Sequence, residues 1–462
     1  MDSKLKHGIV AVFIANMINV FFSLCTNFLL PKFLSVDSYA QIKTYQLYVS
    51  YVGLLHFGFV DGVYLRYGGK DIHDLNQGKL HSNLMTMRVF QIAIVALSLA
   101  VGVVIKDPIF VFFALSILPL NMNNYFKFLY QATGEFKRYG NAMNVTTIAI
   151  FAVNMILLFA VSTDYYSAYL AGYVIVYAAI WLYLEFSFKR GFGSIKARFS
   201  LSELATNIKD GFLLTLGNLA SIFLTSMDRW FVKILMDTVA FAQYSFAVSV
   251  ENFLNLAITP ITTTLYNYFC RESDSEKRHT VIQSVVAFAV LLPSAAFGVK
   301  FILEIFLTEY IDSCNVVFFL FSAQMFGIII KGIYVNLYKV ERKQKRYFAK
   351  LCSVIAIGFV TNTLFYYVWG VKEAFALATL VSTFIWFVIS SFDFKKIGIT
   401  VFTGVFLILQ VVVLILCGLF LPAILGFLVY IAYTVIMMFV FMRPTVMIFL
   451  RMTRARLSKF KH

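Results

Sequence analysis

The chain has 462 residues, of which 60% are apolar and only 13% are charged. Because an ordinary soluble protein has about 25% charged residues, this composition excludes a soluble multidomain enzyme and a disordered chain. The apolar runs are continuous and do not alternate, which argues against a membrane β-barrel. A net charge of +16 would suggest nucleic acid in a soluble protein. Cytoplasmic loops of membrane proteins collect Lys and Arg anyway, so we expect no nucleic-acid partner.

Fourteen apolar runs are long enough to cross a bilayer, which takes about 20 residues of helix. We expect spanning helices near residues 8–30, 41–61, 85–105, 109–131, 142–161, 166–187, 211–231, 241–265, 281–303, 315–338, 350–369, 374–392, 400–420 and 424–442. The sequence therefore predicts an all-α polytopic membrane protein. Before the seventh span, the capping-box pattern Ser200-Leu201-Ser202-Glu203 predicts a short surface helix that leads into it.

Lys and Arg gather in the loops that follow the even-numbered spans and in the tail from Arg443 to Lys461. The opposite side has few cations: Lys32, Lys106, Lys233, Lys300 and Lys372. The positive-inside rule therefore predicts that both termini are cytoplasmic, and the basic tail is expected to anchor on anionic lipids. The five cysteines are scattered and form no CxxC pair, so we expect no metal site, disulfide framework or cofactor.

An internal repeat relates the two halves of the chain. Leu129-Tyr130 and Lys137-Arg138-Tyr139 recur as Leu337-Tyr338 and Lys345-Arg346-Tyr347, and 337 − 129 and 345 − 137 both equal 208. The repeat predicts an N-lobe at 1–198 and a C-lobe at 199–398, each with six spans, followed by the last two spans and the tail at 399–462. Because each lobe has an even number of spans, the lobes should relate by a pseudo-two-fold axis along the membrane normal, as in alternating-access transporters.

Two lysines lie inside predicted spans, where a charge is costly and normally faces protein or water. Lys127 lies near Asn123 and Asn124 on the fourth span, and Lys331 lies seven residues after Gln324 on the tenth. At the offset of 208, Asn123 corresponds to Lys331. We interpret these residues as an anion site, above all for phosphate, since Lys binds phosphate as a point charge. The competing interpretation of Lys127 is that it snorkels to the cytoplasmic interface.

Other ionisable groups are candidates for ion coupling. Glu251 and Asn255 share a face of the eighth span, and the carboxylate could bind a coupling proton or Na⁺, or could be a static partner for a Lys. His56 could titrate, although a lone His is more often structural. Asp228 and Arg229 lie near the outer end of the seventh span, where interfacial charges with local partners are the simpler expectation.

No motif typical of catalysis is present: the sequence has no GxxxxGK[ST], HExxH or GxSxG pattern. We therefore expect a transporter and no enzyme. Its energy would come from an ion gradient, from the membrane potential or from the gradient of the substrate itself.

Four segments resemble bacterial oligosaccharide flippases of the Wzx type, in the multidrug/oligosaccharidyl-lipid/polysaccharide exporter superfamily. They are FGFVDGVYLRYGG at 57–69, DRWFV at 228–232 with AQYSFA at 242–247, and NFLLPKFL at 27–34. The resemblance implies that the protein moves undecaprenyl-pyrophosphate-linked repeat units to the outer leaflet of the bacterial inner membrane, for O-antigen or capsule synthesis. Polysaccharide polymerase and chain-length machinery are the implied partners. The cationic cavity of the family maps onto Lys127, Lys331, Arg66 and Arg229.

Two alternatives stay open. One is a cation-coupled multidrug exporter of the same superfamily, although an acid-rich cleft would suit cationic drugs better than one with Lys. The other is an enzyme, a membrane polysaccharide polymerase or glycosyltransferase. Such enzymes usually need a large outside loop, and the outside loops predicted here have about ten residues or fewer.

Overall fold

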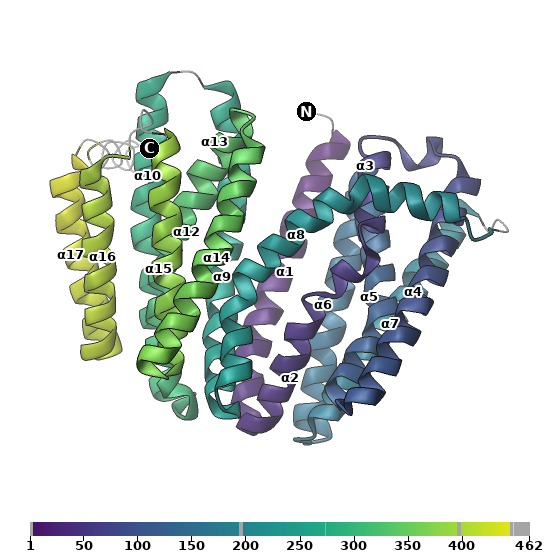
Figure 1. Cartoon of the computed structure of the whole chain (residues 1–462), viewed down its shortest axis with the longest axis horizontal. Helices are drawn as coiled ribbons and strands as arrows, with labels where there is room; N and C mark the ends of the chain where they lie inside the picture. The colour runs from purple at the N-terminus through teal and green to yellow at the C-terminus, as the bar shows by residue number, and fades with distance from the viewer. Residues whose placement is uncertain (1–2, 194–196, 273, 395–398, 444–446, 448–462) are drawn as a thin grey trace, which may run out of the picture. The chain divides into compact units, whose positions relative to one another are not determined.

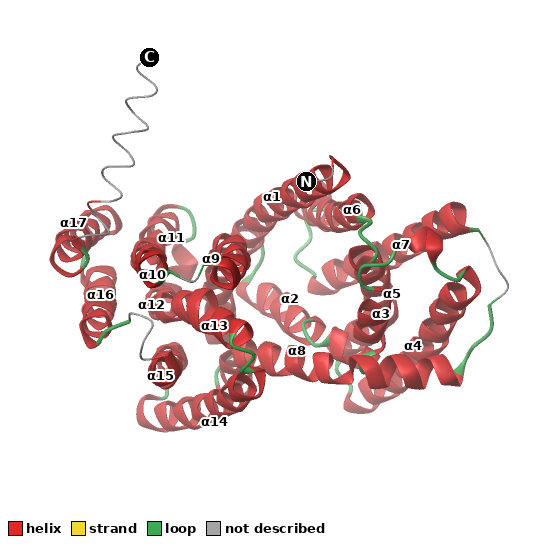
Figure 2. Ribbon diagram, turned by 90° about the horizontal axis from the view of Figure 1, so that it is seen from above, coloured by secondary structure: helices red, strands yellow, loops and turns green. Residues whose placement is uncertain are grey.

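The computed structural model describes residues 3–193, 197–272, 274–394, 399–443 and 447, and every regular element in these ranges is a helix (Figures 1 and 2). Lys196, Lys395, Lys396 and the tail cations beyond residue 447 lie outside the described residues. The chain divides into two compact units, Met1–Ser226 and Met227–His462. The division falls within α8 (Leu201–Leu235), so the lobe boundaries at 198 and 398 stay predictions.

The first unit is built around α5 (Pro108–Ala132), which packs against α4 (Gln77–Ile105) and α7 (Tyr166–Phe192). Its core gathers large aromatic side chains from these helices, including Tyr125, Phe126 and Phe188. The remaining elements are α1 (Ser3–Phe33), α2 (Val36–Val49), η1 (Val52–His56), α3 (Phe59–Tyr67), η2 (Ile72–Asp74), α6 (Phe136–Met155), the π-helical turn η3 (Ile156–Ala160) and the first part of α8.

The second predicted span is broken, where the sequence predicted one helix over 41–61. The structure has α2, the short 3₁₀ helix η1 and then α3. The break includes Phe57 and Gly58, which adopt left-handed backbone conformations with φ of 51° and 98°. An α-helix cannot continue through two such residues.

The second unit is built around α12 (Cys314–Ile329), which is buried along most of its length and packs against α9 (Thr238–Arg271), α15 (Lys372–Ser391) and α16 (Val401–Phe420). After the end of α8 the elements are α9 (Thr238–Arg271), α10 (Ser275–Leu291), η4 (Leu292–Ser294), α11 (Ala295–Ile305), η5 (Thr308–Ser313), α12, the π-helical turn η6 (Ile330–Tyr334), α13 (Val335–Val340), α14 (Gln344–Trp369), α15 (Lys372–Ser391), η7 (Phe392–Phe394), α16 (Val401–Phe420) and α17 (Ala423–Phe441).

The predicted all-α membrane architecture is confirmed. Among the described residues, 11 helices are long and apolar enough to cross a membrane. The other three predicted spans lie on α1, on the broken α2–α3 segment and on α9. Each of the fourteen predicted spans therefore lies on helical residues, apart from the turn residues that break the second one.

The turns that follow α5 and α13 are built from the same backbone hydrogen bonds. Thr133 N donates to Leu129 O at 3.0 Å, and Glu341 N donates to Leu337 O at 2.9 Å; both pairs are 208 residues apart. The residue in the left-handed conformation is Gly134 in the first turn and Arg342, again 208 later, in the second. This correspondence of backbone geometry supports the predicted duplication.

Candidate functional site: a polar strip on α9

Four polar positions lie along one face of α9 in the second unit. They are Tyr244, Glu251, Asn255 and Thr262, at spacings of 7, 11 and 18 residues from the first. At 3.6 residues per turn these spacings bring every position back to one stripe of the helix. The backbone or side chain at each position bonds to a neighbouring helix, and we call this set the α9 strip.

Lys331 joins the strip from the π-helical turn η6. Its Nζ donates to Asn255 Oδ1 at 2.8 Å, and its side chain is half-buried. Within the described residues Lys331 makes no ion pair, so its direct partner is a neutral amide. Single π-helical turns inside α-helices are frequent at functional sites.

Glu251 is held by a second amide, one helical turn from Asn255. Gln324 Nε2 donates to Glu251 Oε1, and Gln324 is buried on α12. Four residues predicted from the sequence, Lys331, Glu251, Asn255 and Gln324, therefore meet across one pair of packed helices. Within the described residues, the direct hydrogen-bond partners of Lys331 and Glu251 are thus uncharged amides.

The two ends of the α9 strip bond to further polar groups. Tyr244 OH donates to the buried Asp228 Oδ2 at 2.7 Å, so Asp228 has the local partner that the sequence analysis expected. Arg229 is half-buried beside it, and its backbone N donates to Asp228 Oδ1 at 2.8 Å. At the other end, Asn336 Nδ2 donates to Thr262 O at 2.8 Å. A lone Asn in an apolar helix was the available signal for this residue.

In the first unit, the predicted polar residues of α5 divide between two faces. Asn123 is buried, and its Nδ2 donates to Tyr177 O of α7 at 3.1 Å, so it acts in helix packing. Asn124 and Lys127 are half-buried, and their side chains make no hydrogen bond or ion pair within the described part of the chain. The structure thus does not place Asn123 as a counterpart of Lys331, whose partner lies on α9.

Sequence analysis missed a further cation, Lys43 of α2. It is buried, and its Nζ donates to Asn27 Oδ1 at 2.9 Å and to Gln46 Oε1 at 3.2 Å. The ring of Tyr39 lies 5.1 Å from Nζ. The signal available was a Lys just inside the predicted second span, with an Asn in the NFLLPKFL segment before it.

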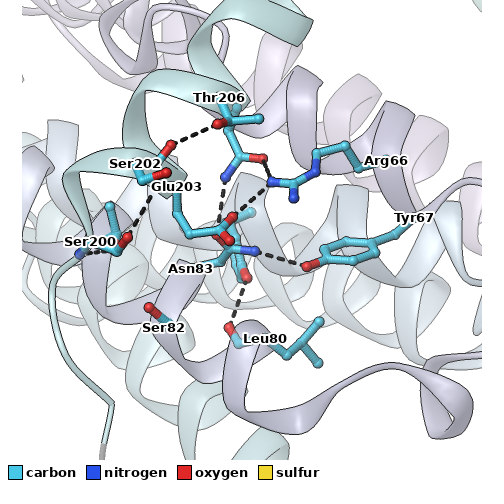
Figure 3. Close-up of polar contacts among 12 residues, drawn as sticks. Arg66, Tyr67, Leu80, Ser82, Asn83, Ser200, Ser202, Glu203 and Thr206 are labelled. Carbon is cyan, nitrogen blue, oxygen red and sulfur yellow. Dashed lines mark hydrogen bonds and ion pairs between the residues drawn. The ribbon is translucent and has the colours of Figure 1, made fainter.

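Arg66 lies in a polar network between α3 and α8, shown in Figure 3. Its Nη1 donates to Glu203 Oε2 at 2.8 Å and to Asn207 Oδ1 at 2.7 Å. Asn207 in turn donates to Asn83 Oδ1 at 3.0 Å, and Asn83 donates to Tyr67 OH at 2.9 Å. Partial burial alone would lower the pKa of Arg66. The hydrogen bond and the opposite charge of Glu203 have the larger effect together, so the pKa of Arg66 is raised. Arg66 thus has an anionic partner inside the fold.

The predicted capping box at the start of α8 forms on one side only. Glu203 N donates to Ser200 Oγ at 3.2 Å, as a capping Ser requires. The Glu203 carboxylate does not return to the Ser200 N–H, which donates to Thr86 Oγ1 at 3.0 Å. The carboxylate binds Arg66 (Figure 3), so the cap and the network share this residue. The helix that begins here continues into the seventh predicted span and ends at Leu235.

Glycines bring α3 and α8 into backbone contact. A Cβ on Gly211 would overlap Gly58 O and Gly62 N, and it would lie 2.9 Å from Asp61 C. A Cβ on Gly62 would lie 2.7 Å from Asn207 C. The FGFVDG segment that carried the family resemblance thus has a physical role, since it lets two helices touch without side chains between them.

His56 is bound within the break of the second span. It is buried, and its Nδ1 accepts a hydrogen bond from Gly58 N at 3.1 Å. This bond fixes Nδ1 as an acceptor and stabilises the turn that contains Phe57 and Gly58. The ion-coupling role assigned to His56 stays a prediction.

No family model and no curated protein sequence matches the chain. Solved structures do, among them the lipid II flippase MurJ in an inward closed conformation, with 14% identity over 95% of this chain and 99% of that one. The TM-score for this pair is 0.70. The chain has the fold of that flippase. A MATE family multidrug resistance transporter of the MOP superfamily, in an inward-facing conformation, also matches. The match covers 83% of this chain and 95% of that one, at 12% identity and a TM-score of 0.54.

Such identities establish the fold and leave the substrate to be argued from the residues. The MurJ match extends over nearly the whole of both chains, so the final helices α16 and α17 belong to the shared architecture. The residues of the α9 strip then carry the argument about function.

Proposed function

We propose that the protein is a flippase for undecaprenyl-pyrophosphate-linked oligosaccharide repeat units. It would move them by alternating access from the cytoplasmic to the outer leaflet of the bacterial inner membrane, for synthesis of a cell-surface polysaccharide such as O-antigen or capsule. The observation that carries the proposal is Lys331, a cation on a spanning helix whose direct partner is the neutral Asn255 amide. The flippase fold supports it.

The physics of the headgroup favours such a site. A diphosphate crossing hydrocarbon unaided would lose its hydration, at a cost far above that of one uncompensated polar group. An amide is uncharged, so it does not neutralise the Lys. The Lys can exchange this neutral acceptor for a phosphate oxygen, which adds the attraction between opposite charges to the hydrogen bond. Lys127 in the first unit is a second candidate for contact with phosphate.

Glu251 is proposed as the coupling residue, for Na⁺ or H⁺. One of its oxygens accepts from Gln324, and the residue lies one turn from the Asn255–Lys331 pair on α9. Binding of a cation or proton at Glu251 would change the field at Lys331, so that ion binding and headgroup binding become linked. No organic cofactor is proposed.

The test is flipping by the purified full chain in liposomes that contain a defined lipid-linked oligosaccharide. We expect Lys331→Ala and Glu251→Gln each to abolish flipping while membrane insertion is retained. Lys331→Arg should keep part of the activity because it keeps the charge. The matched control is Lys137→Ala, which removes an exposed Lys and should leave flipping unchanged. Wild-type flipping by the Lys331→Ala variant would refute the assignment, and absence of flipping by the wild-type protein would refute the function.

A second candidate is a cation-coupled multidrug exporter. The specific observation that favours it is Glu251, whose carboxylate has an amide and no cation as its direct partner among the described residues. Resistance of expressing cells to cationic drugs, lost in the Glu251→Gln variant, would select this alternative. Glycan elongation by the purified protein would instead select the enzyme alternative.

Further expectations follow from the flippase proposal. Both termini would lie in the cytoplasm, and polysaccharide polymerase and chain-length machinery would be partners. Cells that lack the gene and have no redundant flippase should accumulate the lipid-linked repeat unit on the cytoplasmic side.

A further inference from the structure

The turn between α13 and α14 carries an excess of exposed cations. Residues 339–346 contain five cations and one acid, a net charge of +4. Lys343 is paired with Glu341 at 2.6 Å, and Arg346 is paired with Asp393 at 2.9 Å. Three exposed cations remain, and their side chains form no hydrogen bond or ion pair with any described residue: Lys339, Arg342 and Lys345. We call these three residues the cationic turn.

The duplicated turn of the first unit provides an internal reference. Residues 131–138 have the same backbone hydrogen bonds but only two cations and one acid, a net charge of +1. Arg138 pairs with Glu135 at 3.4 Å, which leaves Lys137. Both turns follow equivalent spans of a duplicated unit, so the positive-inside rule applies equally to both. It therefore cannot account for the difference between them.

Arg342 occupies a backbone conformation that favours glycine. Its φ is 54°, and its counterpart in the first unit is Gly134 with φ of 75°. A left-handed conformation is unfavourable for any residue with a Cβ, so Arg342 is less stable at this position than the glycine of the duplicate. The two turns therefore differ at this point of the same backbone, where one has a bare glycine and the other has an exposed cation.

The position of the cationic turn indicates its partner. It joins the apolar helical segments Thr308–Val340 and Gln344–Trp369, so it lies where a spanning pair of helices leaves the hydrocarbon. Phe348 lies three residues after Lys345 on α14 and is 46% exposed. Cations beside an exposed aromatic ring fit a phosphate headgroup above the start of its acyl chains. We propose that Lys339, Arg342 and Lys345 dock the phosphate of acidic phospholipids.

The test is lipid binding by the detergent-purified full chain, titrated with phosphatidylglycerol and, separately, with neutral phosphatidylcholine, and read by native mass spectrometry. Each cation at a membrane surface should contribute about five-fold to the affinity. Arg342→Gly should therefore weaken phosphatidylglycerol binding about five-fold, and Lys339→Gln, Arg342→Gly and Lys345→Gln together about 100-fold. Phosphatidylcholine binding should not change. The matched control is Lys137→Gln in the duplicate turn, which should keep wild-type binding.

Each outcome decides the proposal. Equal phosphatidylglycerol binding by the triple variant and the wild type would overturn it, and so would an equal loss in Lys137→Gln. Displacement of the lipid by an equal concentration of inorganic phosphate would show a site for a free anion and would also overturn it. If the triple variant unfolds, Arg342→Gly decides alone, because glycine suits that backbone conformation. The assay needs no flipping, so its failure is distinct from failure of the proposed function.

Discussion

Replacement of Gly211 by Ala should destabilise the first unit, because the new methyl group would meet backbone atoms. A Cβ at this position overlaps Gly58 O and Gly62 N and lies 2.9 Å from Asp61 C. Side chains can change rotamer to relieve a clash, but the backbone of α3 can only move away as a whole. Overpacking of this kind costs about 1–3 kcal/mol. Separation of the helices would also weaken the bonds from Arg66 to Glu203 and Asn207, which are partly exposed, so we expect a total loss of about 3 kcal/mol.

The same helix offers a matched control. A Cβ added at Gly217 would have no heavy atom within 4 Å, so Gly217→Ala should be neutral or stabilising by up to about 1 kcal/mol. A loss of about 3 kcal/mol corresponds to about 6–12 °C in the unfolding midpoint of a domain of this size. Heating followed by size-exclusion chromatography of the detergent-purified protein measures that midpoint. Equal midpoints for the two variants would refute the backbone contact between α3 and α8.

Two further stability predictions use the same assay. Ser200→Ala removes the cap of α8 and should lower the free energy of unfolding by about 1 kcal/mol. The control Ser202→Ala, at an exposed position in the first turn of the same helix, should lower it much less, and equal effects would contradict the capping role. Asp393→Asn removes the charge of a buried carboxylate that binds three side chains, and it should lower the free energy of unfolding by about 1–3 kcal/mol. Glu341→Gln breaks an exposed ion pair and should lower it by less than about 1 kcal/mol. A larger loss for Glu341→Gln than for Asp393→Asn would contradict the burial argument.

Helical periodicity predicted the middle of the α9 strip, where Glu251 and Asn255 share one face. Glu251 and Asn255 are four residues apart, and Gln324 and Lys331 are seven apart, so each pair had to lie on one face of its helix. Periodicity alone does not say which helices pack together. The predicted transport function did require the polar faces of these two helices to avoid the lipid. The structure brings all four side chains into direct contact in two pairs.

Features that depend on tertiary contact could not be predicted. The break after His56 requires Phe57 and Gly58 to adopt left-handed conformations, and Gly58 there packs against the backbone of α8, which lies far away in the sequence. Likewise, the Asn123 side chain points toward α7, where its amide donates a hydrogen bond to the backbone carbonyl of Tyr177. The α8 backbone and the Tyr177 carbonyl are both distant in sequence from the residues that contact them, so local patterns could not predict these contacts.

The π-helical turn that contains Lys331 has a consequence for the symmetry of the duplicated protein. The matching helix of the first unit, α5, runs from Pro108 to Ala132 as regular α-helix, whereas its duplicate is widened over Ile330–Tyr334. A single π-helical turn rotates the side chains that follow it about the helix axis, relative to those that precede it. The loops at the two ends keep their lengths. The two duplicated helices thus differ in helical pitch as well as in residue at this position, where one has Lys331 and the other Asn123.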